Sequence, residues 1–96
     1  MGKIAPTALD EIRMMIAALD KYINTVSQNI ESMKRAAITC TTAMSSDSIS
    51  MEMVKQLTTS RKLLEASVDE AAGIKKKLEA EEIDITNNVG SFINNG

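Results

Sequence analysis

The chain has 96 residues, which corresponds to a single domain. Its net charge of −2 at pH 7, with 25% charged residues, does not favour binding to nucleic acid or anionic lipid. It contains no His and a single Cys, which leaves out a His-based acid–base site, an intramolecular disulfide and a thiolate zinc cluster. We therefore expect no enzymatic activity, no cofactor and no metal centre.

The N-terminal residues 1–7 contain no apolar segment of the kind that a Sec signal peptide requires, so no such signal is expected. No run of apolar residues approaches the ~20 that span a bilayer, and we expect no membrane insertion. The expected location is the cytoplasm, with export by a Sec-independent route as an open alternative.

A first helix is predicted over residues 8–44. Thr7 can cap its N-terminus, and Asp10, three residues later, completes a capping-box pattern after Pro6. The helix is then marked by apolar or small residues at strictly alternating spacings of three and four, which is the pattern of a coiled-coil seam. The seam positions are Leu9, Ile12, Ile16, Leu19, Ile23, Val26, Ile30, Met33, Ala37, Cys40 and Met44.

The predicted helix break lies between residues 39 and 50, where Thr and Ser are crowded together. Their hydroxyls compete for backbone hydrogen bonds, and Thr loses rotamer freedom in a helix. The turn is placed at residues 45–48, and Asp47 or Ser48 is expected to cap the second helix. Cys40 is expected to be a small buried side chain near this turn, with a reactive thiol as the alternative.

A second helix is predicted over residues 49–84, followed by a flexible tail over residues 85–96, which has no helical pattern. Its seam repeats every seven residues at Leu57, Leu64, Ala71, Leu78 and Ile85. The alternate seam positions are assigned to Met53, Val54, Val68 and Ile74. The lysines at 75–77 are expected to pair with acidic residues one turn later.

Two helices of similar length with facing seams predict an all-α antiparallel hairpin. Two helices cannot enclose a core, and further apolar residues fall outside the seam. We therefore expect a partner to complete a four-helix bundle or a larger helical complex. These outer residues are Met14, Met15, Ala18, Tyr22, Ile38, Met51 and Leu63.

The residues predicted to form the interface come from both seams. They are Ile12, Ile16, Leu19, Ile23, Val26, Ile30, Met33, Leu57, Leu64 and Leu78.

Two helices in about a hundred residues, joined by a short polar turn, resemble the WXG-like small helical proteins of type VII secretion. Those proteins carry Trp-x-Gly at the turn, where this chain has Met44-Ser45-Ser46-Asp47. The chain is more similar to the helical proteins that accompany LXG-type toxins, which lack Trp-x-Gly and carry an aromatic-x-x-x-acid signal late in their second helix. The nearest match is Leu78-Glu79-Ala80-Glu81-Glu82.

The resemblance implies a targeting partner, or a small secreted substrate, that docks on the helical N-terminal region of a toxin. It also implies that Leu78 and Glu82 form an export signal. The interaction partner would be a toxin region, a homologous small helical protein or a second copy of the chain. The alternative function is a cytosolic coiled-coil regulator or chaperone with no role in secretion.

Overall fold

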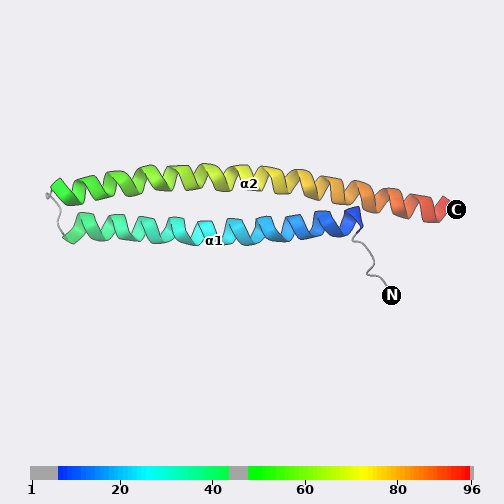
Figure 1. Cartoon of the computed structure of the whole chain (residues 1–96), viewed down its shortest axis with the longest axis horizontal. Coiled ribbons are helices and arrows are strands. Elements are labelled where there is room, and N and C mark those ends of the chain that lie inside the picture. The colour runs from blue at the N-terminus through cyan, green and yellow to red at the C-terminus, as the bar shows by residue number, and fades with distance from the viewer. Residues whose placement is uncertain (1–6, 44–47, 96) are drawn as a thin grey trace.

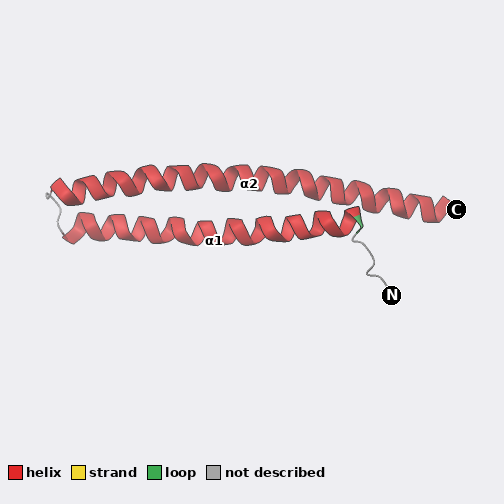
Figure 2. Cartoon of the chain, in the orientation of Figure 1, coloured by secondary structure: helices red, strands yellow, loops and turns green. Residues whose placement is uncertain are grey.

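The structure is a computed structural model that describes residues 7–43 and 48–95. It consists of two long helices, α1 over Ala8–Ala43 and α2 over Ser48–Asn95, which lie side by side and antiparallel (Figure 1). The described residues contain no strand (Figure 2). The predicted all-α helical hairpin is thereby confirmed.

The N-terminus of α1 is closed by the predicted capping box. The backbone N–H of Asp10 donates to Thr7 Oγ1 at 3.1 Å, and the backbone N–H of Thr7 donates to Asp10 Oδ2 at 3.3 Å. These reciprocal bonds satisfy amide groups that have no partner within the helix. Asp10 and Glu11 also place negative charge in the first turn, where the helix dipole favours it.

The helix break lies within the predicted stretch, since α1 ends at Ala43 and α2 begins at Ser48. Met44 and most of the predicted turn at 45–48, including Asp47, lie outside the described residues. The threonines before the break do not end α1 early. The hydroxyls of Thr41 and Thr42 donate to the carbonyl oxygens of Ala37 and Ile38, four residues back, so the helix accommodates them.

The predicted end of the second helix at residue 84 is wrong, and so is the flexible tail over 85–96 as far as residue 95. α2 continues to Asn95 and has 48 residues, against 36 in α1. Pro6 is the sole proline of the chain, so no residue of the C-terminal segment removes a backbone donor. Asn and Gly cost a helix at most about 1 kcal/mol each, which does not force it to stop. α2 therefore extends past the start of α1 (Figure 1).

The hairpin is long and thin, with extents of 73 × 31 × 15 Å. Its radius of gyration is 21.4 Å, whereas a compact domain of this length would have about 12.5 Å. Among the described residues, the buried apolar side chains are Ile12, Val26, Ile30 and Ala71, and all four lie on the two seams. The core is thus a single row of side chains between two helices.

Candidate partner-binding surfaces

The ten side chains predicted for the interface all lie on the contact between α1 and α2. Ile12, Val26 and Ile30 are buried, and the other seven are half-buried. The hairpin uses these side chains to hold its own helices together. A surface available to a partner must therefore lie outside the seam.

The seam of α2 is more highly charged than the sequence analysis predicted. Leu57, Leu64, Ala71, Leu78 and Ile85 are half-buried or buried, as are Val54 and Val68. Met53 and Ile74, however, were assigned to this seam wrongly, because they are 47% and 48% exposed. The remaining alternate positions belong to Arg61, Lys75 and Glu82, which are half-buried and continue the spacing of seven residues from Val54.

Two of these charged seam residues pair with α1. Arg13 Nε donates to Glu82 Oε2 at 2.8 Å, and Lys75 Nζ lies 2.5 Å from Asp20 Oδ1. Lys75 therefore pairs across the hairpin and not with the acidic residues one turn later. The hydrogen bond to Asp20 raises the pKa of the Lys75 ammonium above its ordinary value of 10.5, the charges of Asp20 and Glu79 add to the rise, and desolvation opposes it.

The raised pKa of Lys75 predicts a loss of stability at high pH. The folded state holds this proton more tightly than the unfolded chain, so the stabilisation is complete well below the ordinary pKa of 10.5 and is lost as the pH rises through the folded pKa. We expect wild type to melt above Asp20→Asn at neutral pH, with the difference shrinking in strong base. Thermal melts of both proteins followed by circular dichroism would measure it. A difference in melting temperature that stays constant with pH would contradict the assignment.

One broad face of the hairpin is free of charge over a long stretch. On α1, Met15, Tyr22, Asn29 and Ala36 are spaced by seven residues beside the seam, and on α2 the matching row is Met53, Ser60, Ser67 and Ile74. The two rows adjoin, because the hydroxyls of Tyr22 and Ser67 are hydrogen-bonded. We call these eight residues the uncharged face. It runs for about 32 Å along α1.

The large side chains of the uncharged face are less exposed than the other large apolar side chains on the surface of the hairpin. Met15, Tyr22, Met53 and Ile74 are 41–48% exposed, whereas Met14, Ile38, Ile49, Met51, Leu63 and Ile83 are 58–70% exposed. The four residues thus lie at the edge of the helix contact, where a further helix could cover them. Covering each one would contribute about 1 kcal/mol, since roughly half of each side chain is already buried.

The accessible surface area of the chain is also large for its mass. Its accessible area is 7482 Å², whereas a compact folded protein of 10.4 kDa exposes about 5,400 Å². The excess of about 2,000 Å² is comparable to the area that a standard protein–protein interface buries.

The two residues of the expected export signal lie on the α2 seam. Leu78 is half-buried against α1, and Glu82 is half-buried in its pair with Arg13. Cys40 is half-buried on the α1 seam, as expected for a packing side chain near the turn. No cluster of three metal-binding side chains occurs in residues 7–43 and 48–95, and neither described helix is long and apolar enough to cross a membrane.

Comparison with known proteins gives no family to which these surfaces could be assigned. No protein-family model, curated protein or solved structure matches the chain.

Proposed function

We propose that this chain is a non-catalytic helical binding protein whose uncharged face docks lengthwise on the helices of a partner. The observation that supports the proposal is the pair of adjoining rows on α1 and α2, in which Met15, Tyr22, Met53 and Ile74 stand among small or uncharged residues. A partner that lays two helices along these rows would complete a four-helix bundle.

The partner that we propose is the helical N-terminal region of an LXG-type toxin, and the role is targeting for type VII secretion. The hairpin shape, the uncharged face and the Leu78–Glu82 segment of α2 support this choice. A homologous small helical protein or a second copy of the chain could occupy the same face. The runner-up function is a cytosolic coiled-coil regulator, which would use the face in the same way but remain in the cell.

Co-expression tests the partner. The chain would be produced together with the helical N-terminal region of an LXG-type toxin from the same genome and purified through a tag on the toxin region. We expect a complex of defined stoichiometry by light scattering after size-exclusion chromatography. A chain that elutes alone, as a monomer, would overturn the proposal, and a homodimer would assign the face to a second copy.

The export role predicts a specific effect of Glu82→Gln. This change keeps the size of the side chain and removes the charge that we propose the secretion machinery reads, while weakening a partly exposed ion pair worth less than about 1 kcal/mol. We expect partner abundance in the culture supernatant to fall, with the intracellular complex intact. Glu81→Gln is the matched control on the exposed side of α2. Equal export in both variants would favour the cytosolic regulator.

A further inference from the structure

Pairs of facing residues recur at steps of seven along the side of the hairpin opposite the uncharged face. Arg13 faces Glu82, and one step further Asp20 faces Lys75, so each of these pairs joins opposite charges. Two more steps in the same register bring Lys34 opposite Arg61, and here both residues are cations. Each of these two cations forms an ion pair within its own helix, Lys34 with Glu31 and Arg61 with Glu65, each at 3.3 Å.

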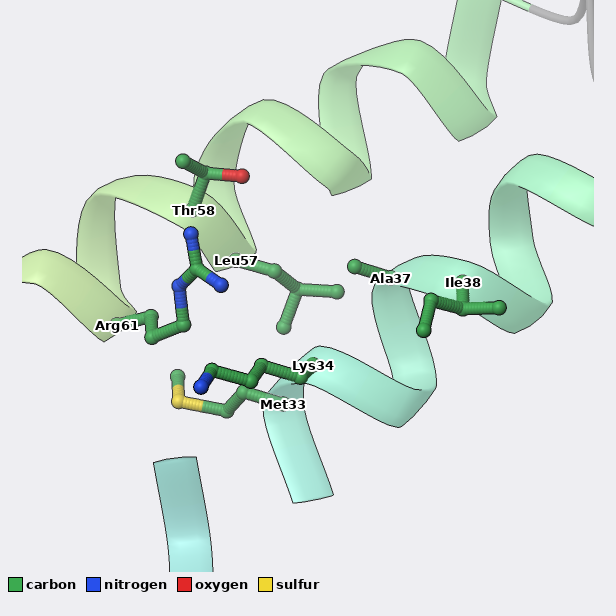
Figure 3. A pocket seen from close by; sticks show the side chains of 7 residues that line it. All are labelled: Met33, Lys34, Ala37, Ile38, Leu57, Thr58 and Arg61. Carbon is green, nitrogen blue, oxygen red and sulfur yellow. The ribbon is translucent and has the colours of Figure 1, made fainter. Parts of the chain in front are cut away.

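Lys34 and Arg61 line an apolar groove of about 240 Å³ between the helices, which we call the Arg61 groove. Its other lining residues are Met33, Ala37, Ile38, Leu57 and Thr58. Figure 3 shows the two cationic side chains toward one end of the groove and Ala37 and Ile38 toward the other, with Leu57 between them.

One donor in this groove lacks a hydrogen-bond acceptor. Arg61 Nε is shielded from solvent and makes no hydrogen bond, because its 3.3 Å contact with Glu65 does not have hydrogen-bond geometry. A shielded donor without an acceptor is destabilising, and native proteins rarely keep one. A carboxylate entering the groove would supply the acceptor and the negative charge that both cations lack from the opposite helix.

The opposite end of the groove is suited to an apolar side chain. Ile38 is 65% exposed at this end. Beyond it, a second hollow of about 210 Å³ is lined by Thr41, Ser50, Met51 and Val54, and Met51 is 64% exposed. Lys34 and Ile38 are four residues apart on α1, which is about 6 Å along the helix axis. A partner helix reaches both ends with side chains one turn apart.

We propose that the Arg61 groove binds a helical segment of a partner protein that presents an apolar side chain and, one turn away, a carboxylate. The apolar side chain lies over Ala37, Ile38 and Leu57, and the carboxylate accepts hydrogen bonds from Arg61 and Lys34. The inference rests on the proposed function, since it requires a helical partner, but it uses the face opposite the uncharged face. It also states the chemistry by which such a partner is selected.

The substitution Lys34→Glu separates this inference from a purely structural role of the two cations. It places a carboxylate opposite Arg61, so the hairpin gains an interhelical ion pair, loses the Lys34–Glu31 pair within α1, and the groove loses its affinity for an anion. The gain and the loss are of similar size, so we expect a melting temperature within a few degrees of wild type. Binding of an acidic helix should become at least about tenfold weaker. If the two cations acted only within the hairpin, Lys34→Glu would leave the binding of the acidic helix unchanged.

The probe is a pair of alanine-based helical peptides of about 16 residues. One carries a leucine and, four residues later, a glutamate, and the other has glutamine in place of that glutamate. In NMR titrations at low salt, the glutamate peptide should shift the methyl signals of Leu57 and Ala37 with an affinity about tenfold or more above that of the glutamine peptide. Lys21→Glu makes the same charge change on the exposed outer side of α1 and should retain this preference.

Equal binding of the two peptides, unshifted signals for Leu57 and Ala37, or an unchanged affinity of Lys34→Glu for the glutamate peptide would each overturn the inference. Ile74→Lys lies on the opposite face and should leave peptide binding unchanged. If the peptides fail to bind while the lengthwise complex still forms, the Arg61 groove is excluded and the proposed function stands. If the peptides bind but no complex forms, the proposed partner is excluded.

Discussion

Replacing Ile30 by aspartate is expected to unfold the hairpin. Ile30 is one of the four buried apolar residues in the part of the chain that the structure describes, and it lies near the middle of the contact between α1 and α2. The change removes about 2 kcal/mol of apolar burial and places a carboxylate in the seam without a counter-ion, at a further cost of several kcal/mol. A domain of this size has little stability in reserve. Circular dichroism should show most of the helical signal lost at room temperature.

Ile38→Asp is the matched control for this experiment. It makes the same chemical change on the same helix at a position that is 65% exposed. We expect it to keep the wild-type helical signal and to melt within a few degrees of wild type. Similar melting curves for Ile30→Asp and Ile38→Asp would show that the seam is not the packed surface of the hairpin.

The double substitution Met15→Lys with Ile74→Lys is expected to abolish partner binding without unfolding the chain. Both side chains belong to the uncharged face and are already 46% and 48% exposed, so the isolated hairpin tolerates lysine there. In a lengthwise complex, two ammonium groups would be covered by apolar surface at several kcal/mol in total. Affinity should fall by a factor of about 100 or more, measured by titration calorimetry with the purified partner region.

The control is Met14→Lys with Ile83→Lys, which adds the same two charges to outward positions that are 66% and 58% exposed. This variant should bind the partner as wild type does. Equal loss of binding in both double variants would mean that net charge, and not the uncharged face, decides association. Retained binding in the Met15–Ile74 variant would place the partner elsewhere on the hairpin.

The parts of this fold that are encoded locally could be predicted from the sequence. The capping box of Thr7 and Asp10 involves residues three apart, and the α1 seam from Leu9 to Cys40 follows directly from the helical period. Each of these described seam residues is buried or half-buried, because a strict alternation of three and four keeps one stripe of a helix toward its neighbour.

The charged positions of the α2 seam could not be found by looking for apolar residues. Arg61, Lys75 and Glu82 occupy seam positions because their stems pack while their charged ends reach α1 or the helix edge. Hydrophobicity instead favours Met53 beside Val54, and Ile74 in place of its neighbour Lys75. The sequence feature that marks these charged positions is their spacing of seven residues from Val54. Charged residues between Arg13 and Lys34 on α1 follow the same spacing.

The end of α2 was missed for a related reason. The tail was predicted because residues 85–96 show no clear helical pattern, yet Val89 and Phe92 continue the seam spacing from Ile85. The low helix propensity of Asn and Gly in this segment is a weak effect, and the seam period continues through it. The uncharged face was beyond local reasoning altogether, because it depends on how the two helices are rotated about their axes when they pack.

The two ion pairs of the hairpin also select a single alignment of its helices. Sliding α2 by one heptad in one direction would bring Lys75 opposite Arg13, and sliding it in the other direction would bring Glu82 opposite Asp20. Each slip breaks both Arg13–Glu82 and Asp20–Lys75 and creates a like-charged contact. A seam of similar aliphatic side chains has little means of telling one heptad from the next. In one direction along the hairpin, α1 presents a positive and then a negative residue, and the facing stretch of α2 presents a negative and then a positive one. This order of charges distinguishes the native alignment from either slip.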